Sequence, residues 1–192
     1  MNQEPTTKVL YLIVCAAGVA VDVSRLVVEA KARGWDVWIV PTPSAVDFID
    51  VPALEELIGH PIRARYRQPG EGGKLPAADA VIVAPATYNT INKWAAGISD
   101  TFALGLLAEL TTSDIPIAVL PFVNASLAAN RVFIRSVAEL RESSVTVLLG
   151  DGGFVPHPAG QGGVKIGEFP WESAVDALFS GLKKTSNAVA DD

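Results

Sequence analysis

Two asparagines follow strand-length apolar runs at equivalent places in the chain. Asn89 comes shortly after the run 80–84, and Asn124 comes shortly after the run 115–120. Both runs stop at a proline, and the carboxyl ends of neighbouring parallel strands meet at one edge of a sheet. Two amides at that edge suit a carboxylate, an amide or the edge of a flat heterocycle. An asparagine after one strand is more often a turn residue, but finding one after both strands favours a binding site.

Small and hydroxylated residues follow the first two apolar runs. The run 9–15 leads into Ala-Ala-Gly-Val at 16–19, whose small side chains let a ligand approach the backbone closely. The run 37–40 leads into Pro-Thr-Pro-Ser-Ala at 41–45, where Thr42 and Ser44 offer hydroxyl groups that suit a phosphate. Ser44 as a plain helix cap is an equally good interpretation.

Conventional catalytic and metal-binding motifs are absent from the sequence. The chain has two histidines, His60 and His157, and one cysteine, Cys15, and no pair of them has metal-ligand spacing. No Walker loop, nucleophile elbow or zinc-protease helix occurs. We expect His60 to mark a helix end and Cys15 to be a small buried residue rather than a nucleophile. His157 lies in a glycine-rich segment and remains a candidate for substrate contact, and no metal site is predicted.

Strand-length apolar runs alternate with segments of helical length along the chain. The runs are continuous, which is typical of parallel strands covered on both faces. We therefore predict an α/β fold, a doubly wound parallel sheet with helices on both faces, as a single domain over residues 8–183 with flexible tails at 1–7 and 184–192. The predicted strands are 9–15, 37–40, 80–84, 115–120 and 145–149, with an edge strand at 61–65, and the predicted helices are 22–33, 52–58, 90–96, 100–110, 126–141 and 171–182.

Two glycine-rich segments, 68–76 and 150–163, interrupt this alternation. In a compact domain, a structureless loop beyond about 12 residues is usually functional or disordered. The segment 150–163 is therefore expected to be a mobile cover over a site, with a surface linker as the alternative.

Composition and charge exclude several classes of partner. The chain has 192 residues, of which 49% are hydrophobic and 19% charged, and its formal net charge is −6. This is the composition of a core-rich globular protein, and the absence of a basic run argues against nucleic acid and anionic membranes as partners. The apolar run 9–20 is shorter than the roughly 20 residues that cross a bilayer. A lone cysteine suits a reducing compartment, so we predict a cytoplasmic protein.

Three ordered motifs resemble those of a known family. Residues 84–100 read Ala-Pro-Ala-Thr-Tyr-Asn-Thr-Ile-Asn-Lys-Trp-Ala-Ala-Gly-Ile-Ser-Asp, residues 42–49 read Thr-Pro-Ser-Ala-Val-Asp-Phe-Ile, and residues 121–124 read Pro-Phe-Val-Asn. They are similar to the Pro-Ala-Ser-x-Asn-Thr…Gly-x-x-Asp, Thr-x-x-Ala-x-x-Phe-Ile and Pro-x-Met-Asn motifs of homo-oligomeric flavin-containing cysteine decarboxylases. That family includes phosphopantothenoylcysteine decarboxylase, and the resemblance extends over most of residues 8–165.

The resemblance implies a fold, a cofactor and an assembly. The family has a Rossmann-like fold and binds FMN at the interface of a homotrimer, and trimers sometimes assemble further. Asn124 corresponds to the asparagine that holds the substrate carboxylate, and we expect Asn89 to act beside it. The implied function is the FMN-dependent oxidative decarboxylation of a cysteine-containing peptide or small thiol. Carried over by motif, the implied FMN contacts are Gly18, Val19, Thr42, Ser44, Phe48, Ala86, Thr87 and Thr90.

Departures from the family pattern leave alternatives open. Glu71 stands at the position of the family's catalytic histidine and is a candidate to replace it as acid or base. Val123 replaces the methionine of Pro-x-Met-Asn, and the region around His157 lacks the Cys-Gly of the substrate clamp. Without that cysteine, reduction of an enethiol intermediate, as in the coenzyme A pathway, is not expected.

The main alternative is therefore a catalytically inactive flavin-binding protein that acts as a regulatory or partner-binding module. A Rossmann-like domain that binds another nucleotide ranks third. A flavin prenyltransferase ranks below a decarboxylase because the Arg-Glu pair that follows a strand in that group is missing.

Overall fold

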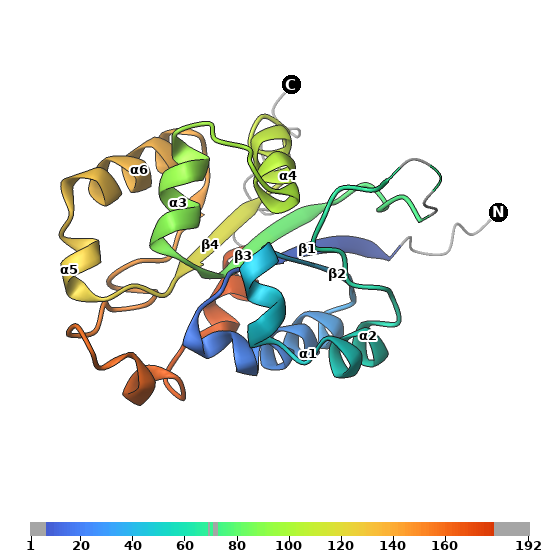
Figure 1. The fold of residues 1–192 in the computed structure, drawn as a ribbon, viewed down its shortest axis with the longest axis horizontal. Coiled ribbons are helices and arrows are strands. Elements are labelled where there is room, and N and C mark those ends of the chain that lie inside the picture. The colour runs from blue at the N-terminus through green and yellow to red at the C-terminus, as the bar shows by residue number, and fades with distance from the viewer. Residues whose placement is uncertain (1–6, 69, 71–72, 179–192) are drawn as a thin grey trace, which may run out of the picture.

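A single parallel sheet forms the centre of the protein in the computed structural model, which describes residues 7–68, 70 and 73–178. Its five strands lie in the order β2-β1-β3-β4-β5 (Figure 1). The α/β fold predicted from the apolar runs is confirmed. The predicted tails lie outside the described residues except for residue 7. The strands are β1 (Lys8–Val14), β2 (Trp35–Pro41), β3 (Ala80–Ala86), β4 (Ile117–Pro121) and β5 (Thr146–Val147).

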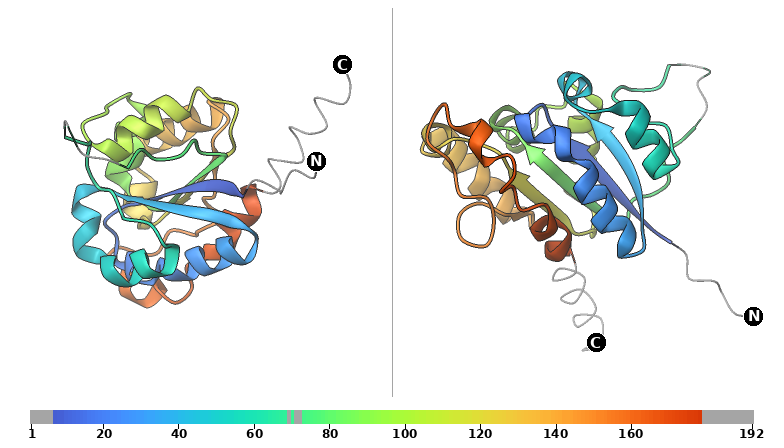
Figure 2. Two further views of the ribbon diagram at one scale, coloured as in Figure 1. Left: turned by 90° about the vertical axis from the view of Figure 1, so that its right-hand side faces the viewer. Right: turned by 90° about the horizontal axis from the view of Figure 1, so that it is seen from below.

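Helices cover both faces of this sheet (Figure 2). One face packs against α1 (Ser24–Ala32), α2 (Val51–Ile58) and a helix that is described over residues 171–178. The other face packs against α3 (Tyr88–Ala95), α4 (Phe102–Leu110) and α6 (Arg131–Glu142). Each face has its own apolar core, as expected for strands that are buried on both sides. The short elements are η1 (Gly18–Asp22), η2 (Pro43–Phe48), α5 (Ala125–Ala128) and η3 (Gly162–Lys165).

The predicted edge strand at 61–65 is wrong, because these residues form no strand. Pro61 has no N–H to donate to a neighbouring strand. The N–H of Ile62 donates to Oε1 of Glu55, 2.8 Å away. With these backbone donors missing or used elsewhere, the segment cannot extend the sheet, and β2 is its edge.

Two helix predictions are wrong in detail. The helix predicted over 126–141 is divided into α5 and α6, because Oδ1 of Asn130 accepts the N–H of Val132 at 2.9 Å and starts a new helix. The helix predicted over 100–110 begins at Phe102, because the hydroxyl of Thr101 caps α4 by accepting a backbone N–H three residues further on. In both places a side-chain oxygen satisfies one of the free N–H groups at a helix start.

A cluster on β2 fixes the chain where it leaves α2. The carboxylate of Asp36 accepts the indole N–H of Trp38 at 2.9 Å and lies 2.6 Å from Nε2 of His60. The rings of Trp38 and His60 are stacked, with centroids 4.0 Å apart and planes 13° from parallel. His60 follows α2, as predicted, and it also anchors the segment that crosses from α2 to β3.

Loss of the shared acceptor in this cluster is expected to destabilise the fold. Asp36→Ala leaves the half-buried polar groups of Trp38 and His60 without their partner, which costs about 1–2 kcal/mol of unfolding free energy. Urea unfolding followed by tryptophan fluorescence measures the change. Glu139→Ala, at an exposed site on α6, is the matched control and should change stability by less than about 0.5 kcal/mol. Equal losses in the two variants would contradict the role of Asp36.

Candidate functional site

The carboxyl ends of four strands bring the candidate residues to one edge of the sheet. Val14 at the end of β1 pairs with Pro41 of β2, and Ala86 at the end of β3 pairs with Pro121 of β4. The elements η1, η2, α3 and α5 begin just beyond these ends. Segments far apart in the sequence therefore meet where open parallel sheets usually bind ligands.

Two threonines form a hydroxyl pair at the start of α3. The hydroxyl of Thr87 caps the helix by accepting the N–H of Thr90 at 3.4 Å, and the two hydroxyl oxygens lie 3.1 Å apart. Thr90 is buried, whereas Thr87 is half-buried. Thr87 is therefore the member of the pair whose side chain can meet a ligand.

Cys15 lies directly beneath this pair and has no exposed surface. Burial raises the pKa of its thiol, and hydrogen bonds with Thr90 and Thr87 offset part of that effect. The thiol therefore keeps its proton at neutral pH, and the prediction that Cys15 is a small buried residue agrees with this position.

Native Cys15 is expected to resist alkylation. Iodoacetamide needs the thiolate, so at pH 8 the folded protein should react about 100 times more slowly than the protein in urea.

The raised pKa of the Cys15 thiol also predicts that the stability of the fold falls above about pH 9, because the thiol then ionises in the unfolded chain but not in the folded one. Mass spectrometry measures the alkylation rate, and urea unfolding across pH measures the change in stability. Cys15→Ala should remove this part of the pH dependence, and rapid native labelling would contradict the burial.

Among the remaining flavin candidates, Thr42 is half-buried, and the others are either exposed or fully buried. Gly18, Ser44 and Phe48 are exposed, the last with 40% of its surface. Val19 and Ala86 are fully buried, so only their backbones can take part in a contact. Ser44 lies inside η2, which begins after Thr42, so the helix-cap interpretation of Ser44 is wrong.

Asn124 caps a helix through its side-chain oxygen. Its Oδ1 caps α5 by accepting the N–H of Leu127 at 2.9 Å. Its Nδ2 makes no hydrogen bond to the described part of the chain and keeps two donors. Asn89 is exposed in the first turn of α3. Both asparagines lie three residues beyond the paired strand ends Ala86 and Pro121.

The glycine-rich segment 150–163 is anchored beside Asn124. The N–H of Ala125 donates to the carbonyl of His157 at 2.7 Å, and both His157 and Phe154 are buried. Nδ1 of His157 lies 2.8 Å from the carbonyl oxygen of Pro158, which can only accept. Nδ1 therefore carries the proton of the neutral ring, and Nε2 holds the free lone pair. That the segment is a mobile cover stays a prediction, and Glu71 lies outside the described residues.

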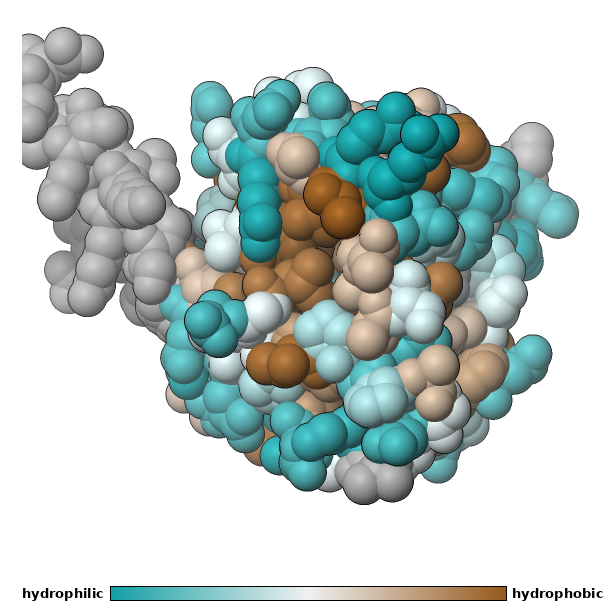
Figure 3. Space-filling model, turned by 90° about the vertical axis from the view of Figure 1, so that its left-hand side faces the viewer, coloured by the Kyte–Doolittle hydropathy of each residue, from teal (hydrophilic) through white to brown (hydrophobic). Residues whose placement is uncertain are grey.

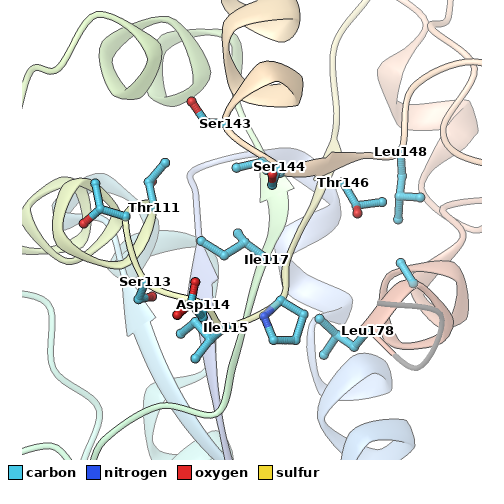
Figure 4. Close-up of a pocket in the computed structure, with 14 residues that line it drawn as sticks. Thr111, Ser113, Asp114, Ile115, Ile117, Ser143, Ser144, Thr146, Leu148 and Leu178 are labelled. Atoms are coloured by element: carbon cyan, nitrogen blue, oxygen red, sulfur yellow. The ribbon is translucent and has the colours of Figure 1, made fainter. Parts of the chain in front are cut away.

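Two cavities are lined by other residues, and the smaller of them adjoins η2, which carries Ser44 and Phe48. The larger, about 990 Å³, lies at the amino ends of β4 and β5, between the ends of α4 and α6 (Figure 4). Its hydroxyl groups include those of Thr111 and Ser113, which donate to carbonyls of their own helix. The smaller, about 540 Å³, lies beside η2. No sequence motif indicated either cavity.

Within the described residues, none of the helices has the length and apolar character to cross a membrane. Among the same residues, no group of three or more histidine, cysteine, aspartate or glutamate side chains is arranged to hold a metal ion.

Comparison with known proteins identifies the family. A family model described as Flavoprotein matches residues 1–168. The chain belongs to the Flavoprotein family. This confirms the resemblance seen in the three motifs, and the Rossmann-like sheet agrees with it.

Curated relatives of this flavoprotein are longer proteins. It is 31% identical over 142 residues to the coenzyme A biosynthesis bifunctional protein CoaBC of Mycobacterium tuberculosis (strain ATCC 25618 / H37Rv), covering 69% of this chain and 31% of the relative. It is 27% identical over 143 residues to CoaBC of Thermococcus kodakarensis, covering 72% and 35% respectively. The chain thus spans about a third of the curated relatives that it matches.

Solved structures with the same fold are described as FMN-dependent cysteine decarboxylases or as related biosynthetic proteins. TvaF from thioviridamide biosynthesis has a TM-score of 0.70 at 20% identity, covering 91% of this flavoprotein and 97% of TvaF. The epidermin biosynthesis protein EpiD from Staphylococcus aureus has a TM-score of 0.62 at 23% identity, covering 73% and 81%. At these identities the likeness establishes the fold.

Proposed function

We propose that the protein binds FMN at the carboxyl edge of the sheet and oxidatively decarboxylates a cysteine-containing peptide or small thiol. The observation that carries the proposal is Asn124, whose Oδ1 is used by the α5 cap while Nδ2 keeps two donors for a carboxylate. Thr87 lies just beyond the end of the neighbouring strand and offers a hydroxyl group. Family membership and the FMN-dependent cysteine decarboxylases among the structural neighbours support this function.

The residues at this edge fit FMN chemically. Thr42, Ser44 and Thr87 supply hydroxyl groups, and Phe48 supplies an exposed ring. None of the eight implied contact residues carries a charge, so a phosphate dianion meets no carboxylate among them. A β-carbon on Gly18 would have only ordinary contact with Ile166, 3.9 Å away, so the first turn leaves room for a ligand. When bound, FMN supplies the acceptor for a hydride from the carbon that carries the thiol.

The protein's own residues hold the substrate and move a proton. Nδ2 of Asn124 donates to the substrate carboxylate and fixes the bond that breaks when carbon dioxide leaves, and Asn89 acts from the neighbouring strand end. A base must also take the thiol proton. His157 has a lone pair on Nε2 because Nδ1 donates to Pro158, and Glu71 is the second candidate.

A flavin-binding protein without decarboxylase activity is the second candidate function. Glu71 in place of the family's histidine, together with the lost Cys-Gly at His157, favours it. Turnover separates the two candidates, since both bind FMN.

The test begins with the visible spectrum of freshly purified protein and the mass of the released chromophore. We expect absorbance near that of an oxidised flavin and the mass of FMN. The protein is then incubated with a panel of peptides that end in cysteine, and loss of carbon dioxide and two hydrogens is sought by mass spectrometry. FMN with turnover supports the proposal, FMN without turnover favours the regulatory candidate, and a colourless protein that rejects FMN overturns both.

We also propose a cytoplasmic homotrimer or multiple of trimers. Apolar side chains gather on the face that carries α5 and α6, within a hydrophilic rim (Figure 3). Exposed apolar residues of these two helices include Leu127, Val132 and Ile134. Patches of this kind mark protein interfaces. Sedimentation equilibrium measures the assembly, and a monomer at micromolar concentration would contradict it.

A further inference from the structure

The larger cavity, of about 990 Å³, lies at the end of the sheet opposite the proposed flavin site. It is found at the amino ends of β4 and β5, whereas the residues proposed to hold FMN follow the carboxyl ends of the strands. Its volume is at the upper end of the range of small-molecule sites. The proposed function assigns no role to this cavity.

Two helices end at the cavity. Thr111 caps the carboxyl end of α4, Ser143 caps that of α6, and both residues line the cavity. The carboxyl end of a helix carries about half a negative charge. The last turn of α6 contains Arg141, but the last turn of α4 contains no basic residue. The end of α4 therefore favours a positive charge on its side of the cavity.

The same side of the cavity presents hydrogen-bond acceptors. The hydroxyl groups of Thr111, Thr112 and Ser113 donate to carbonyls of α4 at 2.5, 3.0 and 2.6 Å. A hydroxyl has one hydrogen, so a group that has donated it can only accept from a ligand. Asp114 follows in the chain, and its exposed carboxylate has no hydrogen bond or ion pair with the described residues. A carboxylate also can only accept.

The side of the cavity at the end of α6 adds polar groups without charge. The hydroxyl groups of Ser143, Ser144 and Thr146 form no hydrogen bond within the described part of the chain, so they can donate or accept. Among the described residues that line the cavity, Asp114 is the one with a charge. The cavity is therefore electronegative and rich in acceptors.

Apolar side chains form the remaining part of the lining. Figure 4 shows Leu148 and Leu178 across the cavity from Thr111 and Ser113. Ile115 and Leu148 are half-buried, so part of their apolar surface is open to a ligand. A ligand that fills the cavity gains free energy by covering these side chains with an apolar body.

We propose that this cavity binds an organic ammonium group that is attached to an apolar body. An ammonium nitrogen has three donors and no acceptor, which matches the hydroxyl oxygens at the end of α4 and the carboxylate of Asp114. The positive charge is favoured both by this carboxylate and by the end of α4. An alcohol of the same shape lacks the charge, and an anion is repelled. Because the cavity is remote from the proposed flavin site, its occupation requires neither FMN nor turnover.

The first experiment titrates three probes of similar size into the purified protein. The probes are phenethylamine, which is an ammonium at neutral pH, the alcohol 2-phenylethanol and the anion phenylacetate. Backbone N–H signals of residues 143–148 in nuclear magnetic resonance spectra locate the binding. We expect phenethylamine to shift these signals and to bind at least about 5-fold more tightly than 2-phenylethanol, and phenylacetate to leave the signals unchanged.

A pair of variants tests the role of the carboxylate. Asp114→Asn removes the charge and keeps the size of the side chain, so it should bind phenethylamine about 5-fold more weakly than the wild type. Glu56→Gln removes an exposed carboxylate on α2 and is the matched control, which should bind the amine like the wild type. Since Asp114 has no partner within the described residues, its variant should keep the wild-type midpoint in urea.

Four results would overturn the inference. Phenethylamine that shifts no signal of the lining shows that the cavity does not bind amines. Equal affinity for the amine and the alcohol shows that apolar contact alone is recognised. Equal weakening in Asp114→Asn and Glu56→Gln reflects the net charge of the chain and not a site. Binding that requires the double variant Lys183→Gln and Lys184→Gln assigns the cavity to lysines of the chain itself, which follow Leu178 in the sequence.

Discussion

Replacement of Gly153 by alanine is expected to lower the free energy of unfolding by about 2–4 kcal/mol. A β-carbon at this position would lie 2.3 Å from the backbone carbon and oxygen of Leu148. Those atoms belong to the main chain and cannot swing aside as the tip of a side chain can. The turn must open, which breaks the hydrogen bonds from Phe154 N–H to Leu148 and from Gly150 N–H to Phe154.

Gly163→Ala is the matched control for this change. Gly163 lies in the same glycine-rich segment, has no positive φ and would place its β-carbon in open space. Urea unfolding should show a change below about 0.5 kcal/mol for the control. Hydrogen exchange at the Phe154 amide gives a local readout, which should accelerate only in Gly153→Ala. Equal stability of the two variants would mean that the close packing of Gly153 against the Leu148 backbone is not needed for the fold.

The turn at Gly153 positions Phe154, which belongs to a group of aromatic rings beside the candidate site. The ring of Phe154 lies 5.1 Å from that of Phe122, and Phe122 lies 5.2 Å from the ring of His157. Phe122 immediately follows β4, two residues before Asn124. Opening the turn should therefore also displace His157, the candidate base, and reduce turnover.

The strands were predictable because their burial is visible in the residue types. The runs that became β1 and β3 are continuous and apolar, which only strands or helices buried on all sides require. The edge strand predicted at 61–65 was wrong for a physical reason. Charged residues occupy alternate positions in this segment, as in an edge strand, but the N–H of Ile62 donates to Glu55, a residue of α2. Such a competing partner comes from tertiary structure and leaves no local pattern.

The candidate site was predictable only to the level of strand ends. Proline and asparagine after two apolar runs placed Asn89 and Asn124 at one edge, and the paired ends Ala86 and Pro121 agree with that. In the described part of the chain, Oδ1 of Asn124 caps α5 while Nδ2 keeps two unused donors, and this arrangement depends on helix geometry that no sequence pattern shows. The smaller cavity lies between η2 and residues 62–65, which come about twenty positions later in the sequence, so no spacing rule could indicate it.

Asn124→Asp is expected to lower kcat/KM at least about 100-fold while FMN stays bound. Aspartate is nearly the same size and keeps an oxygen for the Leu127 N–H, so the α5 cap survives. It replaces the two Nδ2 donors with a negative oxygen, which repels the substrate carboxylate. Like charges in contact cost several kcal/mol, and each 1.4 kcal/mol corresponds to about tenfold. Turnover of a cysteine-ending peptide and the flavin content of the purified variant are the two measurements.

Two further variants separate the cap from the substrate contact. Asn124→Ser keeps a capping oxygen but loses the amide donors, so it should lose turnover at wild-type stability. Asn124→Ala loses both and should also lose about 1 kcal/mol of unfolding free energy. If Asn124→Asp turns over substrate like the wild type, Asn124 is only a helix cap and the carboxylate is held elsewhere. If the aspartate variant loses FMN at full stability, Asn124 is a cofactor residue, and the donors that the α5 cap leaves unused face the flavin instead of the substrate.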